Sequence, residues 1–165
     1  MAVEIERKFL VRGADWRRQV VRSIAMDQGY LGGDRCSVRV RLEGEAAALN
    51  IKSREAGAKR LEFEYPLPVG DARELLARLA GTRITKTRHH VEVDGQLFEI
   101  DEFAGDNAGL IVAEIELDAL DSPFPRPSWL GRELTDEARF YNLRLATTPF
   151  ATWNDRDAIL EEIAC

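Results

Sequence analysis

Seven short segments in which polar and apolar residues alternate are the feature that most limits how this chain folds. They are VEIERKFLV, CSVRVRL, ALNIKS, RLEFEYPL, TRITKTRHHV, QLFEIDEF and LIVAEIELD. Successive side chains of a β-strand point to opposite faces, so this alternation predicts strands with one polar and one apolar face. Asp94-Gly95 adds a hairpin signal, because both residues tolerate the positive φ angles of a type I′ turn. The sequence therefore predicts an antiparallel sheet.

The polar face of these predicted strands is charged, and charges two residues apart have the same sign. The pairs are Glu4/Glu6, Arg39/Arg41, Glu62/Glu64, Lys86/Arg88, Glu99/Asp101 and Glu114/Glu116. Such side chains are about 6.6 Å apart, so the like charges repel weakly in water and strongly where the dielectric constant is low. A surface shaped only for solubility would mix the signs. Separate acidic and basic clusters favour a site for divalent cations and a multiply charged anion.

For any single strand, a simpler interpretation is a sheet with its charged face in water and its apolar face on a core. This interpretation predicts that replacing Arg39 and Arg41 together by Ala changes little. Only the finding that all six pairs of charges have matching signs favours a binding site over a solvated surface.

An eight-stranded antiparallel sheet can close into a barrel, and the charged face would then line its lumen. Thirteen groups are expected inside: Glu4, Glu6, Lys8, Arg39, Arg41, Lys52, Glu62, Glu64, Lys86, Arg88, Asp101, Glu114 and Glu116. Carboxylates without His or thiolate ligands favour Mg²⁺ or Mn²⁺ over Zn²⁺. Basic side chains that face one another across a tunnel suit phosphoryl oxygens. A linear polyphosphate is the ligand that such a lumen would fit.

Four segments have the apolar periodicity of amphipathic helices and are expected to cover the apolar outside of the barrel. They are Asp15–Ile24, Asp71–Leu79, Trp129–Ala138 and Asp155–Ile163. Ala56–Ala58 is expected to form a hairpin loop. The predicted fold is α+β, a single domain over residues 1–165 in which an eight-stranded antiparallel β-barrel with a charged lumen carries helices on its outside.

Composition narrows the class of function. The chain of 165 residues has 23 Lys and Arg against 29 Asp and Glu, a net charge of -6. Binding to nucleic acid or to an anionic membrane is therefore not expected, since both depend on positive potential. No apolar run approaches the roughly 18 residues of a membrane helix. Cys36 and Cys165 are too few for a disulfide scaffold, and we expect a cytoplasmic protein with reduced thiols.

The order of these residues resembles a known family. Glu4-Ile5-Glu6-Arg7-Lys8-Phe9 is similar to the N-terminal ExExK strand of the CYTH superfamily, the triphosphate tunnel metalloenzymes. The similarity continues through Arg39-x-Arg41, Ile51-Lys52-Ser53, Arg60-x-Glu62-x-Glu64, Lys86-x-Arg88, Phe98-Glu-Ile-Asp101-x-Phe103, Gly109-Leu110, Ala113-Glu-Ile-Glu-Leu117 and Arg139-Phe-Tyr-Asn142. It covers residues 3 to about 145. Glu102 stands where many members have an apolar residue, and we expect it outside the tunnel.

The resemblance implies an eight-stranded tunnel, dependence on Mg²⁺ or Mn²⁺, and a small-molecule substrate that carries a triphosphate. The implied triphosphate-binding residues are Lys8, Arg39, Arg41, Lys52, Lys86, Arg88 and Arg139. The implied metal ligands are Glu4, Glu6, Asp101, Glu114 and Glu116. Glu62 or Glu64 would position or deprotonate the attacking water, and Lys86 would also act in catalysis as a cation for the equatorial oxygens.

Several activities fit this resemblance, because the family includes inorganic, thiamine and RNA triphosphatases and class IV adenylate cyclases. The absence of a recognisable base-binding insert favours hydrolysis of inorganic tripolyphosphate to pyrophosphate and phosphate. The alternatives are an adenylate cyclase or a nucleoside or thiamine triphosphatase, and, from a different class, a module that only binds polyphosphate or nucleotide. The sequence leaves open whether the chain forms a homo-oligomer.

Overall fold

The computed structural model describes residues 3–32, 35–54 and 57–165. Within these residues the strands are β1 (Val3–Val11), β2 (Val20–Gly32), β3 (Cys36–Glu43), β4 (Ala46–Ser53), β5 (Lys59–Pro66), β6 (Thr82–Val93), β7 (Gln96–Phe103), β8 (Ile111–Glu116) and β9 (Leu130–Glu133). The α-helices are α1 (Val69–Arg78), α2 (Asn142–Thr147) and α3 (Arg156–Ala164). Short 3₁₀ helices form at Asp15–Gln19, Gly105–Asn107, Ala138–Phe140 and Phe150–Thr152.

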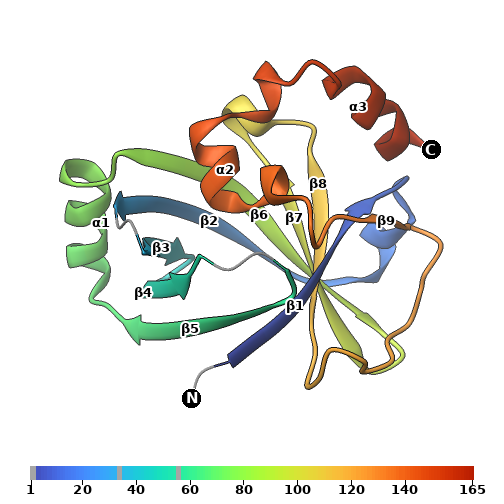
Figure 1. Ribbon diagram of the computed structural model, residues 1–165, viewed down its shortest axis with the longest axis horizontal. Coiled ribbons are helices and arrows are strands. Elements are labelled where there is room, and N and C mark those ends of the chain that lie inside the picture. The colour runs from blue at the N-terminus through green and yellow to red at the C-terminus, as the bar shows by residue number, and fades with distance from the viewer. Residues whose placement is uncertain (1–2, 33–34, 55–56) are drawn as a thin grey trace.

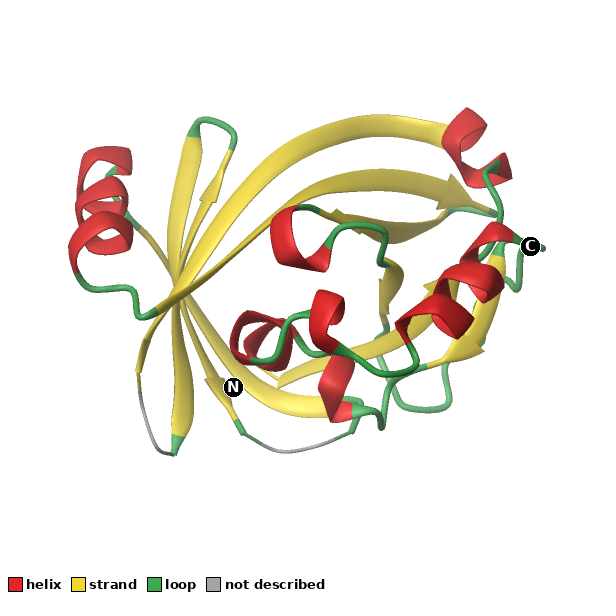
Figure 2. Ribbon diagram, turned by 90° about the horizontal axis from the view of Figure 1, so that it is seen from above, coloured by secondary structure: helices red, strands yellow, loops and turns green. Residues whose placement is uncertain are grey.

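The first eight strands close into an antiparallel barrel. Their order in the sheet is β5-β4-β3-β2-β6-β7-β8-β1, and β1 closes it by pairing with β5 as well as with β8. Residues Val3–Ile5 of β1 pair with β5, and Glu6–Leu10 pair with β8. Figure 2 shows the long strands curving around a common interior. The predicted eight-stranded barrel is confirmed.

Apolar side chains lie mainly on the outside of the barrel, under the helices. The larger core, which includes Phe9, Phe98 and Phe150, lies between β1, β6, β7 and β8 and the C-terminal segment. A smaller core lies beneath α1, where Leu76 packs against Val40 of β3. Figure 1 shows α1 beside β3, β4 and β5, α3 on the other side of the molecule, and α2 between them. The barrel is therefore covered outside, as predicted, and its charged faces point inward.

Two of the four predicted helices are correct. The prediction over Asp71–Leu79 corresponds to α1, and that over Asp155–Ile163 to α3. The Asp94-Gly95 hairpin is also confirmed, because φ is 49° at Asp94 and 78° at Gly95 between β6 and β7. The predicted loop at Ala56–Ala58 begins outside the described residues. None of the helices in the described part of the chain has the length and apolarity to span a bilayer.

The helix predicted over Asp15–Ile24 is wrong beyond its first turn. Only Asp15–Gln19 is helical, as a 3₁₀ helix, and Val20 begins β2, the longest strand. The β-branched residues Val20, Val21 and Ile24 suit a strand better than a helix. The alternation of charges did not identify this strand, because its lumen face carries neutral side chains, among them Gln28 and Tyr30.

The helix predicted over Trp129–Ala138 is also wrong, since Leu130–Glu133 forms β9 and pairs with β1. A Cβ atom on Gly131 would lie 2.7 Å from the backbone oxygen of Leu10. Glycine therefore permits the close approach of β9 to β1, and the tertiary pairing overrides the helical periodicity.

Candidate active site in the barrel lumen

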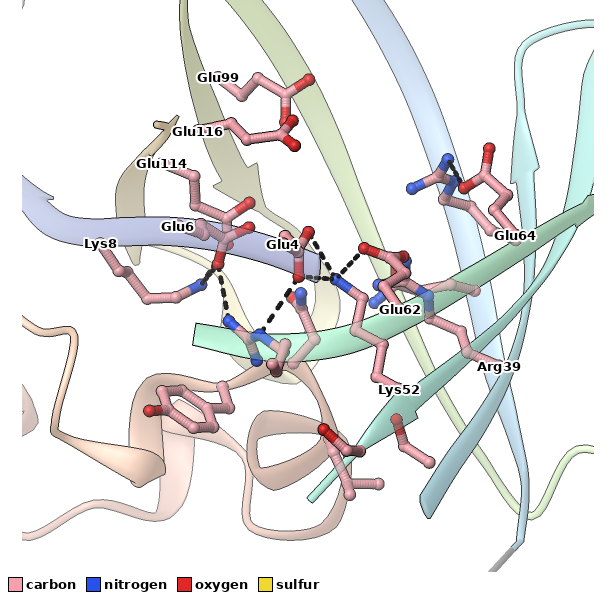
Figure 3. A pocket seen from close by; sticks show the side chains of 18 of the residues that line it. Glu4, Glu6, Lys8, Arg39, Lys52, Glu62, Glu64, Glu99, Glu114 and Glu116 are labelled. Atoms are coloured by element: carbon pink, nitrogen blue, oxygen red, sulfur yellow. Dashed lines mark hydrogen bonds and ion pairs between the residues drawn. The ribbon is translucent and has the colours of Figure 1, made fainter. Parts of the chain in front are cut away.

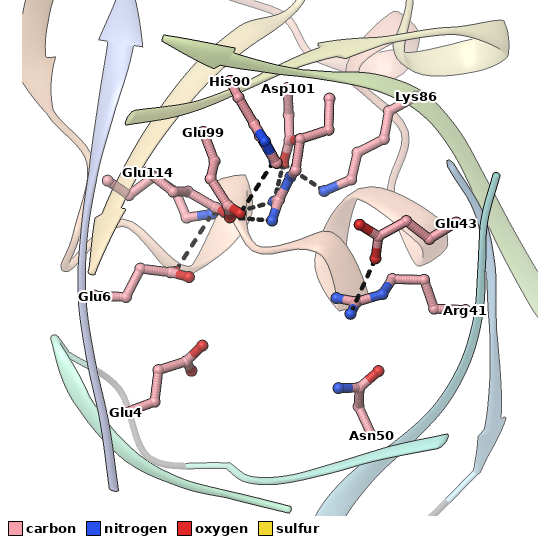
Figure 4. A network of polar contacts seen from close by, with 12 residues as sticks. Glu4, Glu6, Arg41, Glu43, Asn50, Lys86, His90, Glu99, Asp101 and Glu114 are labelled. Atoms are coloured by element: carbon pink, nitrogen blue, oxygen red, sulfur yellow. Dashed lines mark hydrogen bonds and ion pairs between the residues drawn. The ribbon is translucent and has the colours of Figure 1, made fainter. Parts of the chain in front are cut away.

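The lumen contains a cavity of about 1390 Å³ lined largely by charged side chains. Twelve of the thirteen predicted groups line it: Glu4, Glu6, Lys8, Arg39, Arg41, Lys52, Glu62, Glu64, Lys86, Arg88, Glu114 and Glu116. Figure 4 shows Glu4 and Glu6 of β1, Arg41 of β3 and Glu99 of β7 pointing into one open space. The charges of separate strands therefore converge, and the interpretation as a solvated outer surface is wrong.

One group of lumen charges forms a buried ion-pair network. Arg88 Nη2 lies 2.6 Å from Glu114 Oε2 and 2.7 Å from Asp101 Oδ2, and Arg88 Nε donates to Asp101 Oδ1 at 2.7 Å. Lys8 pairs with Glu114, and Lys86 pairs with Asp101. All five side chains are buried, so the network is well shielded from solvent. It holds three cations in place on one wall of the cavity.

Burial and charge act on this network in opposite directions. Burial raises the pKa of Glu114, but the charges of Lys8, Arg88 and Lys86 more than offset it and hold that pKa well below its ordinary value. For Lys86 the balance is reversed. Burial and the nearby Arg88 charge outweigh the attraction of Asp101 and lower the pKa of Lys86 to about 8. Additional negative charge beside Lys86 would therefore stabilise its protonated form.

A second group surrounds Glu4 and Glu6 at the start of β1. Lys52 Nζ lies 2.9 Å from Glu4 Oε2 and 3.0 Å from Glu62 Oε2. Arg60 contacts both acidic residues of β1, with Nε 3.2 Å from Glu4 Oε2 and Nη2 3.1 Å from Glu6 Oε1. Figure 3 shows these side chains meeting between β1 and β5. Lys52 and Arg60 thus lie among three carboxylates, and Lys8 Nζ lies 4.0 Å from Glu6 Oε1 as a third, more distant cation.

The pKa values of Glu4 and Glu62 are shifted in opposite directions. Burial, repulsion from Glu6 and a hydrogen bond with Glu62 raise the pKa of Glu4 to about 7, despite Lys52. Burial also raises the pKa of Glu62, but the hydrogen bond with Glu4 and the charge of Lys52 bring it down to about 2. Glu62 is therefore the ionised member of the pair at neutral pH.

A third group lies on β3, β4 and β5. Arg41 Nη2 lies 3.0 Å from Glu64 Oε2 and 3.2 Å from Glu43 Oε2. Asn50 Nδ2 donates to Glu62 Oε1 at 2.9 Å and to Glu64 Oε2 at 2.5 Å. Asn50 thereby links the two candidate water-positioning carboxylates.

Among the predicted triphosphate-binding cations, Arg39 is the one that makes no ion pair with a carboxylate of the described residues. Its side chain is only 8% exposed and its Nε atom has no hydrogen-bond partner there. Its guanidinium donates a hydrogen bond to the Tyr30 side chain. The charge of Arg39 helps to lower the pKa of Glu62, but no carboxylate of the described residues is in direct contact with the guanidinium. An anion bound in the cavity would therefore compensate its buried charge more fully.

Sequence reasoning missed several lumen residues. Arg60 and Glu99 stand on charged strand faces that the alternation already identified, so their placement was open to prediction. Asn50 is two residues before Lys52 and lies on the same strand face. A single neutral amide, however, does not distinguish a site residue from an ordinary polar residue in the sequence. Gln28 and Tyr30 were missed because they are neutral and stand beyond Ile24, in the part of β2 for which no element was predicted.

Two predicted site residues do not line the cavity. Asp101 is 1% exposed and lies behind Lys86 and Arg88, so it serves as their counter-ion and is poorly placed to contact a metal ion. Arg139 is on the outside, where Nη1 lies 2.7 Å from Asp155 Oδ2 and the guanidinium stacks on Trp153. Arg144 of α2 lines the cavity instead. The side on which Arg139 projects depends on the 3₁₀ turn at Ala138–Phe140, which the sequence did not reveal.

Glu102 lies outside the tunnel, as expected, and the two histidines lie on opposite faces of β6. His89 stands outside the lumen, between Ser23 Oγ at 2.8 Å from Nδ1 and Glu102 Oε2 at 3.2 Å from Nε2. Glu102 also accepts two hydrogen bonds from Arg17, outside the barrel. His90 faces the opposite way, with Nε2 3.6 Å from Glu99 Oε1. These contacts are consistent with packing roles for His89 and Glu102.

The donor set of the lumen fits a hard divalent cation. Glu6 and Glu116 stand directly opposite each other in the β1–β8 pair, and Glu116 has no cationic partner among the described residues. Like charges in this position repel, and a cation between them would remove the repulsion. Among the described residues, however, no three acidic, His or Cys side chains already form a metal-binding cluster. Binding would therefore require side chains such as Glu4 to turn from their present partners.

Comparisons with known proteins agree with this geometry. The CYTH domain family matches residues 2–147. The chain is 39% identical over 157 residues to a protein of Acetivibrio thermocellus named inorganic triphosphatase, covering 94% of this chain and 100% of that one. It is 37% identical over 148 residues to a protein of Nitrosomonas europaea with the same name, covering 87% and 96%.

Solved structures share the fold. A crystal structure of an inorganic triphosphatase has a TM-score of 0.66 at 34% identity, covering 88% of this chain and 95% of that one. A conserved hypothetical protein of Pyrococcus furiosus has a TM-score of 0.57 at 22% identity, covering 73% and 81%, and is similar in fold alone.

Proposed function

This chain belongs to the CYTH domain family, and on that premise we propose that it is an inorganic triphosphatase, hydrolysing tripolyphosphate to pyrophosphate and phosphate. Two relatives with this name align over nearly their whole length, which supports the activity. The choice of tripolyphosphate over nucleoside or thiamine triphosphate rests on the names of these relatives, because the lumen charges fit the triphosphate group that all three share.

The observation that carries the proposal is the buried Arg39 guanidinium in the lumen, which makes no direct ion pair with a carboxylate of the described residues. Five other predicted substrate-binding cations line the same cavity: Lys8, Arg41, Lys52, Lys86 and Arg88. A linear triphosphate has several phosphoryl groups with charged oxygens and is able to contact cations on different strands at the same time. Guanidinium groups bind such oxygens through paired hydrogen bonds, so Arg39 and Arg41 would hold the chain in a defined register.

We assign Mg²⁺ or Mn²⁺ to Glu4, Glu6 and Glu116. A cation bound there would neutralise charge on the phosphoryl oxygens. Glu114 is already engaged by Lys8 and Arg88, and its role is to hold those two cations. Asp101 is not assigned to the metal, because it is buried behind Lys86 and Arg88.

Glu62 and Glu64 are assigned to the attacking water. With a pKa of about 2, Glu62 is a weak base, so it orients water by accepting a hydrogen bond and does not remove the proton early in the reaction. Phosphoryl transfer through a loose transition state needs little deprotonation of the nucleophile. The water oxygen bonds to a terminal phosphorus, the bridging P–O bond breaks, pyrophosphate departs and the water proton is lost to solvent. Lys86 and Arg88 stabilise charge on the equatorial oxygens.

The substrate is the small-molecule partner in this proposal, and the site of action is the cytoplasm. Cys36 and Cys165 are free thiols, as a reducing compartment would keep them.

A substrate panel tests the proposed function. Purified protein is incubated with tripolyphosphate, ATP, thiamine triphosphate or pyrophosphate, with Mg²⁺ or Mn²⁺, and products are separated by ion chromatography. We expect tripolyphosphate to have the highest kcat/KM and to give one phosphate and one pyrophosphate. Formation of cyclic AMP, a clear preference for thiamine triphosphate, or tight binding of tripolyphosphate without turnover under any of these conditions would contradict it.

A further inference from the structure

Gln28 of β2 is a fully buried side chain with no hydrogen-bond partner for either polar atom. It is 0% exposed, and neither Nε2 nor Oε1 is bonded to any group of the described residues. Buried amides are nearly always hydrogen-bonded, because an unpaired one loses its hydration without compensation. Gln28 nevertheless stands at the wall of the cavity. An amide in this position therefore needs an explanation beyond packing.

Further unpartnered polar atoms surround Gln28. It is directly opposite Arg41 in the β2–β3 pair, and its neighbour on the same face, Tyr30, is opposite Arg39. Asn50 is opposite Arg39 in the β3–β4 pair. The Nε atoms of Arg39 and Arg41 and the Oδ1 atom of Asn50 also lack hydrogen-bond partners. Unpaired donors and acceptors thus concentrate on one wall, formed by β2, β3 and β4.

Packing alone does not require glutamine here. Met26 occupies the same face of β2 and is 3% exposed, so this wall accommodates an unbranched apolar side chain of similar size. The backbone at Gln28 is held from outside, because a Cβ atom on Gly29 would lie 2.7 Å from Ala80 Cβ and 2.8 Å from Leu76 Cδ2. The segment that contains α1 therefore packs tightly on β2. Gln28 thus projects from a fixed strand, and only its side chain has to turn to reach a ligand.

We propose that Gln28 is a substrate-binding residue whose amide Nε2 donates to a phosphoryl oxygen of the triphosphate held by Arg39 and Arg41. Its Oε1 accepts from Arg41 Nε, which orients that guanidinium toward the same anion. An amide suits this task because it adds a donor to the anion without adding a positive charge that would itself need compensation when the site is empty. This inference rests on the proposed function and names a further residue of its site.

Three variants test the proposal. Gln28→Met removes both polar atoms and keeps the length of the side chain. Gln28→Glu keeps the shape and places a carboxylate against the anion. Gln96→Met is the matched control, because Gln96 also stands at the cavity wall but its Nε2 already donates to the Pro123 carbonyl oxygen at 3.2 Å. Binding of tripolyphosphate is measured by calorimetry in EDTA, turnover with Mg²⁺, and Tm without ligand.

For Gln28→Met we expect tripolyphosphate binding to weaken about tenfold, with Tm unchanged or higher, since an unpaired buried amide is removed. For Gln28→Glu we expect binding to weaken by about 100-fold, through repulsion of the anion. Gln96→Met should bind within about twofold of the wild type. A purely structural role would instead lower the Tm of Gln28→Met. If that variant does not fold, the isosteric Gln28→Glu variant carries the test.

Wild-type binding by both Gln28→Met and Gln28→Glu would overturn the Gln28 proposal and leave the proposed function intact. Weaker binding accompanied by a fall in Tm in Gln28→Met, with wild-type binding by Gln28→Glu, would also overturn it. Failure of the wild-type protein to bind or hydrolyse tripolyphosphate would overturn the proposed function itself, and the Gln28 proposal with it.

Discussion

Glu6 of β1 and Glu116 of β8 stand directly opposite each other in the barrel wall, so two carboxylates face the same part of the lumen. In an antiparallel pair, directly opposed side chains lie about 5 Å apart and like charges there destabilise the sheet. Arg60 offsets part of this repulsion through its ion pair with Glu6, and a metal cation between the two carboxylates would offset the rest. It is the geometric basis for placing the metal at this end of the site.

We expect Glu116→Gln to weaken Mn²⁺ binding at least about tenfold, because it removes a charged oxygen ligand. Unfolding of the metal-free variant by urea should show equal or greater stability, since the repulsion from Glu6 is also lost. Mn²⁺ binding is measured by electron paramagnetic resonance. Glu74→Gln, an exposed change on α1, is the control and should bind Mn²⁺ like the wild type. Equal Mn²⁺ affinity in all three proteins would refute the assignment of Glu116.

Arg39→Met should reduce kcat/KM for tripolyphosphate about 100-fold, the equivalent of about 3 kcal/mol from a lost pair of charged hydrogen bonds. Because Arg39 has no carboxylate partner among the described residues, no buried anion is left behind and Tm should not fall. Arg139→Met is the control, since that guanidinium lies outside the cavity on Asp155. The prediction fails if the two variants lose activity equally.

Lys86 should make the stability of the ligand-free protein rise with pH above about 8. The pKa of Lys86 is lowered from 10.5 to about 8 in the folded protein. Between these values the unfolded chain retains a proton that the folded protein has released, so the free energy of unfolding increases with pH. The increase is at most about 3 kcal/mol from pH 8 to 10.5.

Urea denaturation at several pH values measures this effect of Lys86 as the difference between the wild type and Lys86→Met. Lys59→Met, an exposed change, should keep the slope of the wild type. An identical pH dependence in the wild type and Lys86→Met would rule the prediction out.

Asp101→Asn should lower the free energy of unfolding by about 3–5 kcal/mol, because Lys86 and Arg88 would remain buried without their main counter-ion. Its Mn²⁺ affinity, measured on the folded variant, should stay close to that of the wild type. Asp155→Asn removes a carboxylate from a surface ion pair and should change neither quantity noticeably. If Asp101→Asn lost as much Mn²⁺ affinity as Glu116→Gln, Asp101 would have to be assigned as a metal ligand.

Much of the barrel and most of the candidate site were predictable from local pattern. Alternation places Arg39 with Arg41, and Glu114 with Glu116, on one face of a strand wherever that strand lies. Because the charges two residues apart on each face have the same sign, the sequence also indicates that these faces meet in a common site. For the same reason α1 and the Asp94-Gly95 hairpin were predictable, since each depends on residues close together in the sequence.

What the sequence alone determined is which side chains share a face, because the two-residue period of a strand is a property of the local backbone. Which cation meets which carboxylate was decided only by the closed barrel. The stagger between strands sets Asp101 behind Lys86 and Arg88 and leaves Arg39 without a partner among the described residues. The same holds for β2 and β9, whose helix-like periodicity gave way to pairing with β6 and β1. The energy of pairing between strands depends on residues far apart in the sequence, so it cannot be read from a short segment. In β2 and β9 this energy outweighed the local preference for helix.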